Sequence, residues 1–197
     1  MQKNIRLGVF GGSFDPPHKA HLELVKLAAK ELRLEHVLVT VANDPWQKSS
    51  MCQVTDGSHR LKMTELLFHG CSEATVTDIE FKLGGESNTA NTLRALRSIY
   101  KSAEFFLLLG YDSAIGIETW RQPEMILDQA KVVVIDRPGF MEEALPPSLS
   151  SAIRLSGLDS SISSQRIRSL LDNEECVSGS IPESIRNYIA DNGLYSE

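Results

Sequence analysis

Apolar and polar positions along this chain follow two kinds of pattern. Short runs that are apolar at nearly every position, such as IRLGVF at 5–10 and FFLLLG at 105–110, are typical of strands buried on both faces of a sheet. Longer segments with apolar residues three and four apart are typical of helices with one buried side. The runs predict strands at 5–10, 36–42, 75–81, 105–110, 131–139 and 152–158. The periodic segments predict helices at 19–33, 59–69, 89–100, 165–171 and 182–192.

The order of these segments predicts the fold class. Strands that alternate with helices indicate βαβ units and a largely parallel sheet. We therefore expect an α/β, Rossmann-like, doubly wound fold, with helices on both faces of a mainly parallel sheet. One domain covers 1–197 in this interpretation, and 160–197 forms a small C-terminal helical part. Ligands bind such sheets at the carboxyl ends of the strands, near a reversal of strand order.

The segment GGSFDPPHKAH at 11–21 leaves the carboxyl end of the first predicted strand. Two glycines let a ligand approach the main chain closely. We expect Pro16 or Pro17 at the first position of the following helix and Asp15 as its cap. The start of that helix offers N–H groups and a positive dipole end, which suit a phosphate.

His18 and His21 are three positions apart, which places both rings on one face of the expected helix. Three explanations compete: a metal site, local capping and packing, and a pair of donors for a phosphate. No third metal ligand at a suitable spacing is evident, and H-E-x-x-H is absent. The glycine turn and the helix start favour the phosphate. The segment matches neither the Walker A loop nor G-x-G-x-x-G.

Composition narrows the class of protein further. The formal net charge of −6 disfavours a nucleic-acid partner, because such proteins present a basic face. Cys52, Cys71 and Cys176 form no C-x-x-C pair and are odd in number, which favours a reduced compartment over a disulfide framework. No apolar stretch approaches the roughly 18 residues of a membrane span, and the first apolar run is too short for a signal peptide. We expect a cytoplasmic protein with no membrane partner.

GGSFDPPHKAH resembles the G-G-x-F-D-P-x-H-x-x-H signature of a nucleotidyltransferase superfamily, whose paired histidines bind the phosphates of ATP or CTP. Further segments resemble, in the same order, motifs of bacterial nicotinate-nucleotide adenylyltransferases. They are DPWQK at 44–48, HRLKM at 59–63, DIEFKLGGESNTANTL at 78–93, FFLLLGYD at 105–112 followed by Trp120, DRPGF at 136–140, ISSQRIR at 162–168 and IPESIRNYIADNGLY at 181–195. The resemblance extends over almost the whole chain.

The resemblance implies a reaction in NAD biosynthesis. An adenylyltransferase of this family joins ATP and nicotinate mononucleotide, giving deamido-NAD (nicotinate adenine dinucleotide) and pyrophosphate. Mg²⁺ is expected as the cofactor, held mainly by the ATP phosphates and water, so that no residue of the chain need be a metal ligand. The oligomeric state is left open, with a homodimer as one expectation.

The resemblance also implies roles for individual residues on the ATP side. The residues expected to be catalytic are His18, His21, Lys48 and Arg168. Those expected to bind ATP or its phosphates are Gly11, Gly12, Ser13, Phe14, Gly110, Asp112, Ser163 and Ser164. Without the resemblance, the two serines fit a helix cap with no ligand, and the lysine fits a solvated surface position.

The residues expected to bind the mononucleotide are Thr89, Trp120 and Arg137. The tryptophan would stack on the pyridine ring and the threonine would lie beside its carboxylate. On residue type alone, the tryptophan fits a core position and the arginine fits a surface ion pair equally well.

Several positions depart from the motifs of this family. Asn88 replaces a tyrosine, Asn91 an aspartate, Tyr111 an alanine and Gln165 a threonine, and the loop reads Trp46-Gln47-Lys48 where Pro-His-Lys is commoner. We expect the two asparagines beside the mononucleotide pocket. They motivate two alternatives: another acceptor, either nicotinamide mononucleotide or phosphopantetheine, and an inactive nucleotide-binding module. The chain length and Trp120 disfavour phosphopantetheine, while the retained histidines disfavour an inactive module.

Overall fold

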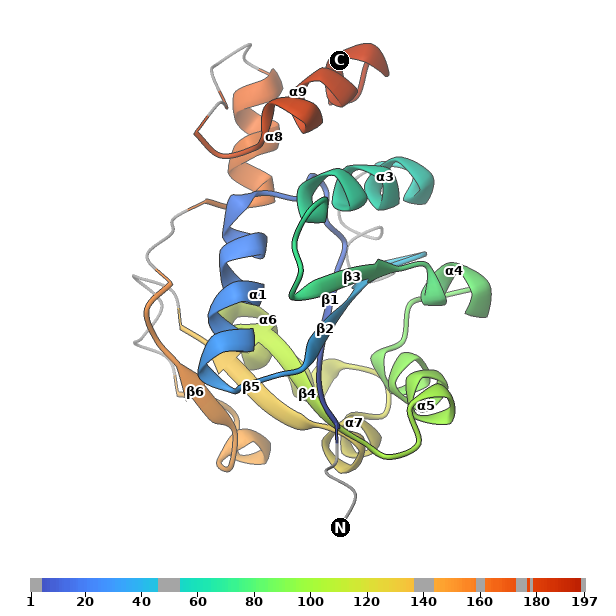
Figure 1. Cartoon of the computed structure of the whole chain (residues 1–197), viewed down its shortest axis with the longest axis vertical. Coiled ribbons are helices and arrows are strands. Elements are labelled where there is room, and N and C mark those ends of the chain that lie inside the picture. The colour runs from blue at the N-terminus through green and yellow to red at the C-terminus, as the bar shows by residue number, and fades with distance from the viewer. Residues whose placement is uncertain are drawn as a thin grey trace.

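Six parallel strands form the centre of the computed structural model (Figure 1). The structure describes residues 5–45, 54–136, 144–158, 162–172, 177 and 179–195. The strands are β1 (Ile5–Gly12), β2 (His36–Val41), β3 (Ala74–Thr77), β4 (Ala103–Gly110), β5 (Lys131–Ile135) and β6 (Ile153–Leu155). They lie in the order β3-β2-β1-β4-β5-β6. The predicted doubly wound α/β fold is therefore confirmed.

Strand order reverses at β1. The chain runs outward from β1 to β2 and β3, then returns to the other side of β1 as β4. Gly11 of β1 pairs with Thr40 of β2, and Gly12 pairs with Val41, so these two strands end at the same level. The glycine turn thus leaves the sheet at the reversal point, where folds of this kind open a crevice for ligands.

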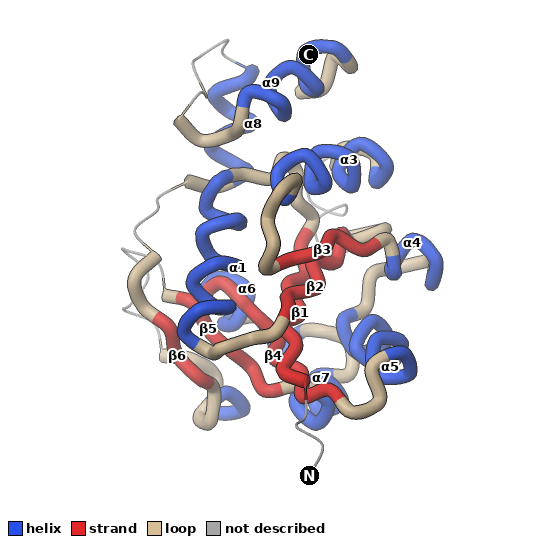
Figure 2. Tube along the Cα trace, viewed as in Figure 1, coloured by secondary structure: helices blue, strands red, loops and turns tan. Residues whose placement is uncertain are grey.

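Helices cover both faces of the sheet, as Figure 2 shows in blue around the red strands. The α-helices are α1 (Lys19–Glu31), α3 (Gly57–Phe68), α4 (Ile79–Leu83), α5 (Thr89–Ile99), α6 (Tyr111–Ile115), α7 (Pro123–Gln129), α8 (Ser164–Asp172) and α9 (Glu183–Asp191). Short 3₁₀ turns occur at Ile117–Thr119 and Pro147–Leu149.

The core consists of two apolar clusters, one on each face of the sheet. Phe106 and Leu108 of β4 join the cluster that contains α1 and α3, whereas Phe105 and Leu107 join the cluster that contains α5, α6 and α7. Successive side chains of a strand point to opposite faces. A continuously apolar run such as β4 is therefore a strand buried on both sides, as its sequence predicts.

The C-terminal helices α8 and α9 lie beyond α1 and α3, at the top of Figure 1. Ile167 of α8, together with Ile185 and Ile189 of α9, belongs to the same apolar cluster as α1 and α3. Both helices were predicted from the sequence, with ends within one residue of those observed.

The prediction of a strand at 75–81 is wrong in its second half. The strand β3 ends at Thr77, and a single helical turn, α4, follows. The alternation in TVTDIEF suggested a strand, but the helical turn buries the consecutive residues Ile79 and Glu80. No strand can bury two neighbours on one face.

The short helices α6 and α7 were also missed by the sequence-based prediction. Residues 137–139 of the strand predicted at 131–139 lie outside the described residues.

Ile99 was expected in the buried stripe of the helix at 89–100. Leu93 and Leu96 are buried there, but Ile99 is 64% exposed at the last position of α5.

Within the described part of the chain, no helix has the length and apolar character needed to cross a membrane.

Candidate active site

The turn after β1 is held by a buried arginine. Arg60 of α3 is 1% exposed. Its Nη1 donates to the carbonyl oxygens of Ser13 at 2.8 Å and Ala42 at 2.7 Å. Its Nε donates to the carbonyl of Thr55 at 2.7 Å, and Nη2 donates to that of Asn43 at 3.0 Å. One guanidinium thus fixes the chain where β1 and β2 end.

Asp15 is the buried anion of the same turn. Its Oδ1 accepts a hydrogen bond from the Tyr195 hydroxyl at 2.6 Å, and its Oδ2 accepts one from the Thr55 N–H at 3.3 Å. Burial and the neighbouring carboxylate raise the pKa of the Tyr195 hydroxyl, so it remains a donor. Asp15 therefore links the turn to the C-terminal segment, and the prediction that it caps α1 is wrong.

The start of α8 meets this turn. Ser164 Oγ donates to the carbonyl of Pro16 at 2.9 Å, and Arg168 Nη1 donates to that of Asp15 at 2.6 Å. Ser163 caps the helix, because its Oγ accepts from the N–H of Arg166 at 3.2 Å. The fold thus brings together the two segments that were predicted to bind phosphate. At the Ser164–Pro16 contact they are 148 residues apart in the sequence.

The two histidines stand at the start of α1. His18 is the N-cap residue and His21 the third residue of the helix, so both predicted proline positions precede the helix rather than begin it. The rings stack with centroids 3.7 Å apart and planes 20° apart. The backbone N–H of His18 donates to His21 Nδ1 at 3.1 Å. In a neutral His21 the proton must then be on Nε2, which makes that nitrogen a hydrogen-bond donor.

Phe14 has a different place from the one expected. Its side chain is buried and packs edge-on against the ring of His21, with centroids 5.0 Å apart. It is not among the residues that line the neighbouring pocket. Phe14 therefore holds the histidine from the core side, and only its backbone could meet a ligand.

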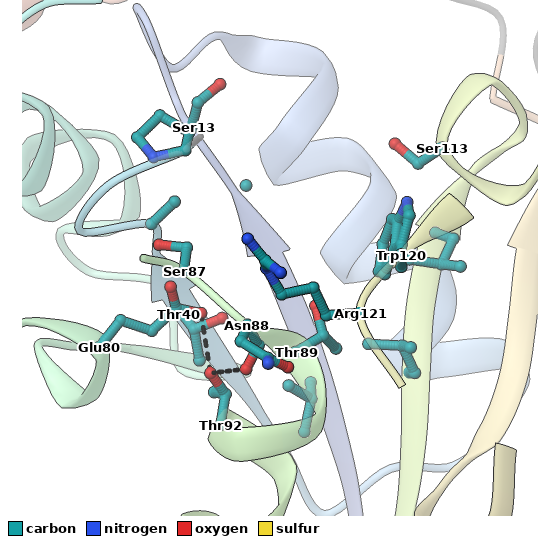
Figure 3. Close-up of a pocket in the computed structure, with 17 residues that line it drawn as sticks. Ser13, Thr40, Glu80, Ser87, Asn88, Thr89, Thr92, Ser113, Trp120 and Arg121 are labelled. Carbon is teal, nitrogen blue, oxygen red and sulfur yellow. Dashed lines mark hydrogen bonds between the residues drawn. The ribbon is translucent and has the colours of Figure 1, made fainter. Parts of the chain in front are cut away.

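A pocket of about 180 Å³ opens at the reversal of strand order (Figure 3). Its apolar floor comes from Val9 of β1 and from Leu107 and Leu109 of β4. The other lining residues are Gly11, Gly12, Ser13, Thr40, Ala42, Pro45, Glu80, Ser87, Asn88, Thr89, Thr92, Ser113, Trp120 and Arg121. A cavity with an apolar floor and a polar wall is suited to a flat ring that carries a polar substituent.

Glu80 of α4 is a buried acid in the wall of this pocket. Its Oε1 lies 3.0 Å from the hydroxyl of Thr92, and the same hydroxyl lies 3.1 Å from the carbonyl of Asn88. A threonine hydroxyl has one hydrogen to donate. Burial raises the pKa of Glu80 and so favours its neutral form. The Thr92 hydroxyl donates to Glu80 Oε1 and also lies within hydrogen-bond distance of the Asn88 carbonyl, so its one hydrogen is shared between two acceptors.

The structure brings together most of the residues predicted for the site. Gly11, Gly12, Ser13, Thr89 and Trp120 all line the pocket. Gly110 ends β4 at the N-cap of α6, and Asp112 lies exposed in the first turn of that helix, outside the pocket lining. Lys48 and Arg137 lie outside the described residues.

The two asparagines that depart from the family motifs have different environments. Asn88 lines the pocket and caps α5, its Oδ1 accepting from the N–H of Ala90 at 3.0 Å. Asn91 is exposed, accepts a hydrogen bond from Arg94 at 2.8 Å and is not a lining residue. Asn88 therefore lines this cavity and Asn91 does not.

Three charged residues of the site were missed or given no role from the sequence: Arg60, Glu80 and Arg121. Arg121 follows Trp120 directly and forms a 2.5 Å ion pair with Glu86. In the sequence, the position of Arg121 next to Trp120 was the one indication that this arginine belongs to the site. Nothing in the sequence indicated that the arginine of HRLKM and the glutamate of DIEF would be buried.

Comparison with known proteins identifies the family. The family model described as cytidylyltransferase-like matches residues 9–170. A protein of Bordetella petrii named "probable nicotinate-nucleotide adenylyltransferase" is 37% identical over 198 residues, which cover 96% of this chain and 98% of its own length. The chain belongs to the nicotinate-nucleotide adenylyltransferase family. A relative of the same name from Chlorobium phaeovibrioides is 36% identical over 98% of this chain and all of its own length.

Solved structures agree on the fold of this adenylyltransferase. Nicotinic acid mononucleotide adenylyltransferase of Plasmodium falciparum, complexed with NaAD, superposes with a TM-score of 0.80 at 20% identity, over 96% of this chain and 97% of its own. The same Plasmodium enzyme complexed with APC gives a TM-score of 0.78. At this level of identity the likeness concerns the fold.

Proposed function

We propose that this adenylyltransferase transfers the adenylyl group of ATP to nicotinate mononucleotide, giving nicotinate adenine dinucleotide and pyrophosphate. The observation that carries the proposal is the stacked His18–His21 pair beside a glycine turn at the reversal of strand order. The glycines end β1 and the histidines begin α1, so one turn carries both. Membership of the family supports the same reaction.

The reaction needs alignment more than proton transfer. A phosphate oxygen of the mononucleotide attacks the α-phosphorus of ATP in line, and the bond from that phosphorus to the β-phosphate oxygen breaks. The nucleophile is an anion at neutral pH and needs no general base. The leaving pyrophosphate needs charge stabilisation rather than a strong acid. Catalysis can therefore rest on positioning and electrostatics.

On the ATP side, His18 and His21 would contact the transferring phosphates, assisted by backbone N–H groups of Gly11, Gly12 and Ser13. The start of α8, with Ser164 and Arg168, would contact the pyrophosphate. Residues assigned to the ATP side by family likeness are Phe14 through its backbone, Lys48, Gly110, Asp112 and Ser163. The contact of α8 with the Asp15–Pro16 backbone supports this grouping.

On the acceptor side, Trp120 would stack on the pyridine ring above the apolar floor. Thr89 is the first residue of α5, whose N-terminus carries partial positive charge. That end of a helix favours a carboxylate over a neutral amide, which supports nicotinate as the ring. Arg137 is assigned to the mononucleotide by likeness to the family alone.

Mg²⁺ would enter with ATP as part of the substrate. Among the residues that the structure describes, no three His, Cys, Asp or Glu side chains gather in a way that could hold a metal ion. Oxygen ligands from phosphates and water suit Mg²⁺. When bound there, the ion would neutralise part of the charge on the leaving pyrophosphate.

Pyrophosphate release tests the proposal directly. We would supply MgATP with nicotinate mononucleotide, and compare wild type with His18→Ala and His21→Ala. Each substitution should lower kcat by about 100-fold or more, because a charge-stabilising donor is removed from the transition state. His69→Ala is the matched control, since His69 is exposed at the end of α3.

Circular dichroism would establish that the variants fold. Wild-type turnover by both folded histidine variants would contradict the assignment of the pair. Release with nicotinamide mononucleotide or phosphopantetheine alone would replace the acceptor and keep the reaction class. Binding of ATP with no release under any acceptor would indicate an inactive module.

A further inference from the structure

An ion pair between Arg121 and Glu86 lies at the pocket described above, in which the pyridine ring of the acceptor would bind. We call this cavity the acceptor pocket. Arg121 Nη2 lies 2.5 Å from Glu86 Oε2, and the two side chains are 49% and 51% exposed. Arg121 lines the pocket, next to Trp120. In Figure 3 its side chain extends from the side of Trp120 towards the wall formed by Ser87 and Asn88. The arginine is thus both a surface residue and part of the cavity wall.

Glu86 is held on the opposite side by backbone contacts. It forms an isolated parallel bridge with Asp44, at the end of the segment that follows β2. The N–H of Ser87 donates to the carbonyl of Asp44 at 2.9 Å, and Asn43 Nδ2 donates to the carbonyl of Gly85 at 2.9 Å. The position of Glu86 is therefore fixed by its main chain, while its side chain remains in solvent.

The described lining of the pocket contains one basic side chain. Among the described lining residues, Arg121 and Glu80 are the two that can carry a charge. Burial favours the neutral form of Glu80. The N-terminus of the 11-residue helix α5 adds partial positive charge at Thr89. Arg121 is thus the one basic side chain among the described lining residues, and its ion-pair partner Glu86 is not a lining residue.

We propose that Arg121 determines the preference for an acidic acceptor ring by exchanging Glu86 for the carboxylate of that ring. The inference rests on the proposed function and concerns which acceptor is chosen. When the planar ring stacks on Trp120, its carboxylate replaces the Glu86 carboxylate as the partner of the guanidinium. A neutral carboxamide cannot make this exchange, because it offers no negative charge.

The exchange is favourable because the two ion pairs have different surroundings. A pair between two half-exposed side chains is weak, since water and salt screen it. A bound ring fills the cavity and removes water, which strengthens a pair formed inside it. Glu86 therefore neutralises the arginine in the empty pocket without competing strongly against an acidic ligand.

The test measures discrimination between two acceptors that differ only in the ring substituent. We would determine kcat/KM with nicotinate and with nicotinamide mononucleotide at saturating MgATP, and measure binding of each mononucleotide by calorimetry. In Arg121→Met, the ratio of the nicotinate value to the nicotinamide value should fall by about 10-fold to 100-fold, as expected for losing hydrogen bonds to a charged group. Arg94→Met is the matched control, because Arg94 is exposed on α5 and outside the pocket lining.

Glu86→Gln tests the exchange itself. Removing the competing carboxylate should strengthen binding of nicotinate mononucleotide by about 2-fold to 5-fold, the range of an exposed ion pair. It should have no such effect in the Arg121→Met background. An Arg121→Met ratio equal to that of wild type would overturn the inference. That outcome includes the case in which kcat/KM falls equally for both acceptors. A wild type that binds the acidic acceptor selectively but releases no pyrophosphate would contradict the proposed function alone.

Discussion

At the scale of single residues, the site depends on buried polar groups that a sequence does not mark as buried. Arg60 lies in a helix whose sequence, GSHRLKMTELLF, suggests a surface arginine beside Lys62. The structure instead gives it four backbone carbonyls as partners. The burial of one residue depends on segments distant in sequence, and periodicity cannot supply that information.

Replacing Arg60 with methionine should destabilise the fold strongly. The change removes the guanidinium and leaves four carbonyl groups, one buried and three partly buried, without their donor, at a cost of about 3–5 kcal/mol in the free energy of unfolding. Urea denaturation would measure the loss. Lys62→Met on the same helix, at an exposed position, should change stability by less than about 0.5 kcal/mol. Equal stability of the two variants would contradict the role given to Arg60.

Glu80 should produce a pH-dependent stability that its amide analogue lacks. Burial raises the pKa of Glu80 above its ordinary value of 4.5. The unfolded chain therefore releases this proton at a lower pH than the folded chain does. The contribution of Glu80 to stability is fully present below pH 4.5 and is lost as pH rises through the raised folded pKa.

Urea denaturation of wild type and Glu80→Gln at several pH values would measure this effect. The free energy of unfolding of wild type should fall, relative to the variant, as pH rises above 4.5. A difference that is constant with pH would show that the pKa of Glu80 is not raised in the folded protein. Thr92→Val provides a second test, because it removes a hydroxyl that donates to Glu80 and lowers its pKa, so the folded pKa should rise further in this variant.

At the scale of elements, the sequence predicted what depends on local pattern. Buried strands such as β4 and long amphipathic helices such as α1 were found within two or three residues of their ends. The turn α4 was missed because its alternating letters match a strand as well as a helix. The helices α6 and α7 are short, and short helices owe their stability to packing rather than to propensity.

The contact between the C-terminal segment and the turn after β1 should be separable from the rest of the fold. Tyr195→Phe removes the hydroxyl that donates to Asp15 and leaves a buried carboxylate oxygen with one partner fewer. Stability should fall by about 1–3 kcal/mol. Hydrogen exchange should accelerate in α9 and in residues 13–18, but not in β4. Tyr100→Phe, at a partly exposed tyrosine, is the control, and uniform acceleration in both variants would contradict this coupling.

At the scale of the whole molecule, substrate should bind across both halves of the sheet. The pocket uses β1 and β4 together with segments that follow β2 and β4. The dinucleotide product should therefore stabilise the protein cooperatively. At 100 times its dissociation constant, it should add about 2.7 kcal/mol to the free energy of unfolding. That is a rise of about 5–10 °C in Tm for a chain of this size.

Differential scanning calorimetry with nicotinate adenine dinucleotide would measure the shift. Adenosine alone, which lacks the phosphates and the pyridine ring, should shift Tm much less. A shift of the same size with adenosine would show that the histidine turn and the acceptor pocket contribute little to binding.

The hydrogen bond between Asp15 and Tyr195 can form only late in the synthesis of the chain on the ribosome. The two residues are 180 positions apart, so at a ribosomal rate of about 5–20 residues per second Asp15 is made roughly 10–35 s before Tyr195. Throughout that interval the nascent chain has the histidine turn but lacks the Tyr195 hydroxyl that donates to Asp15. A prematurely terminated chain would leave that turn unfinished. The turn that carries His18 and His21 would thus reach its complete set of contacts only in polypeptides translated through Tyr195.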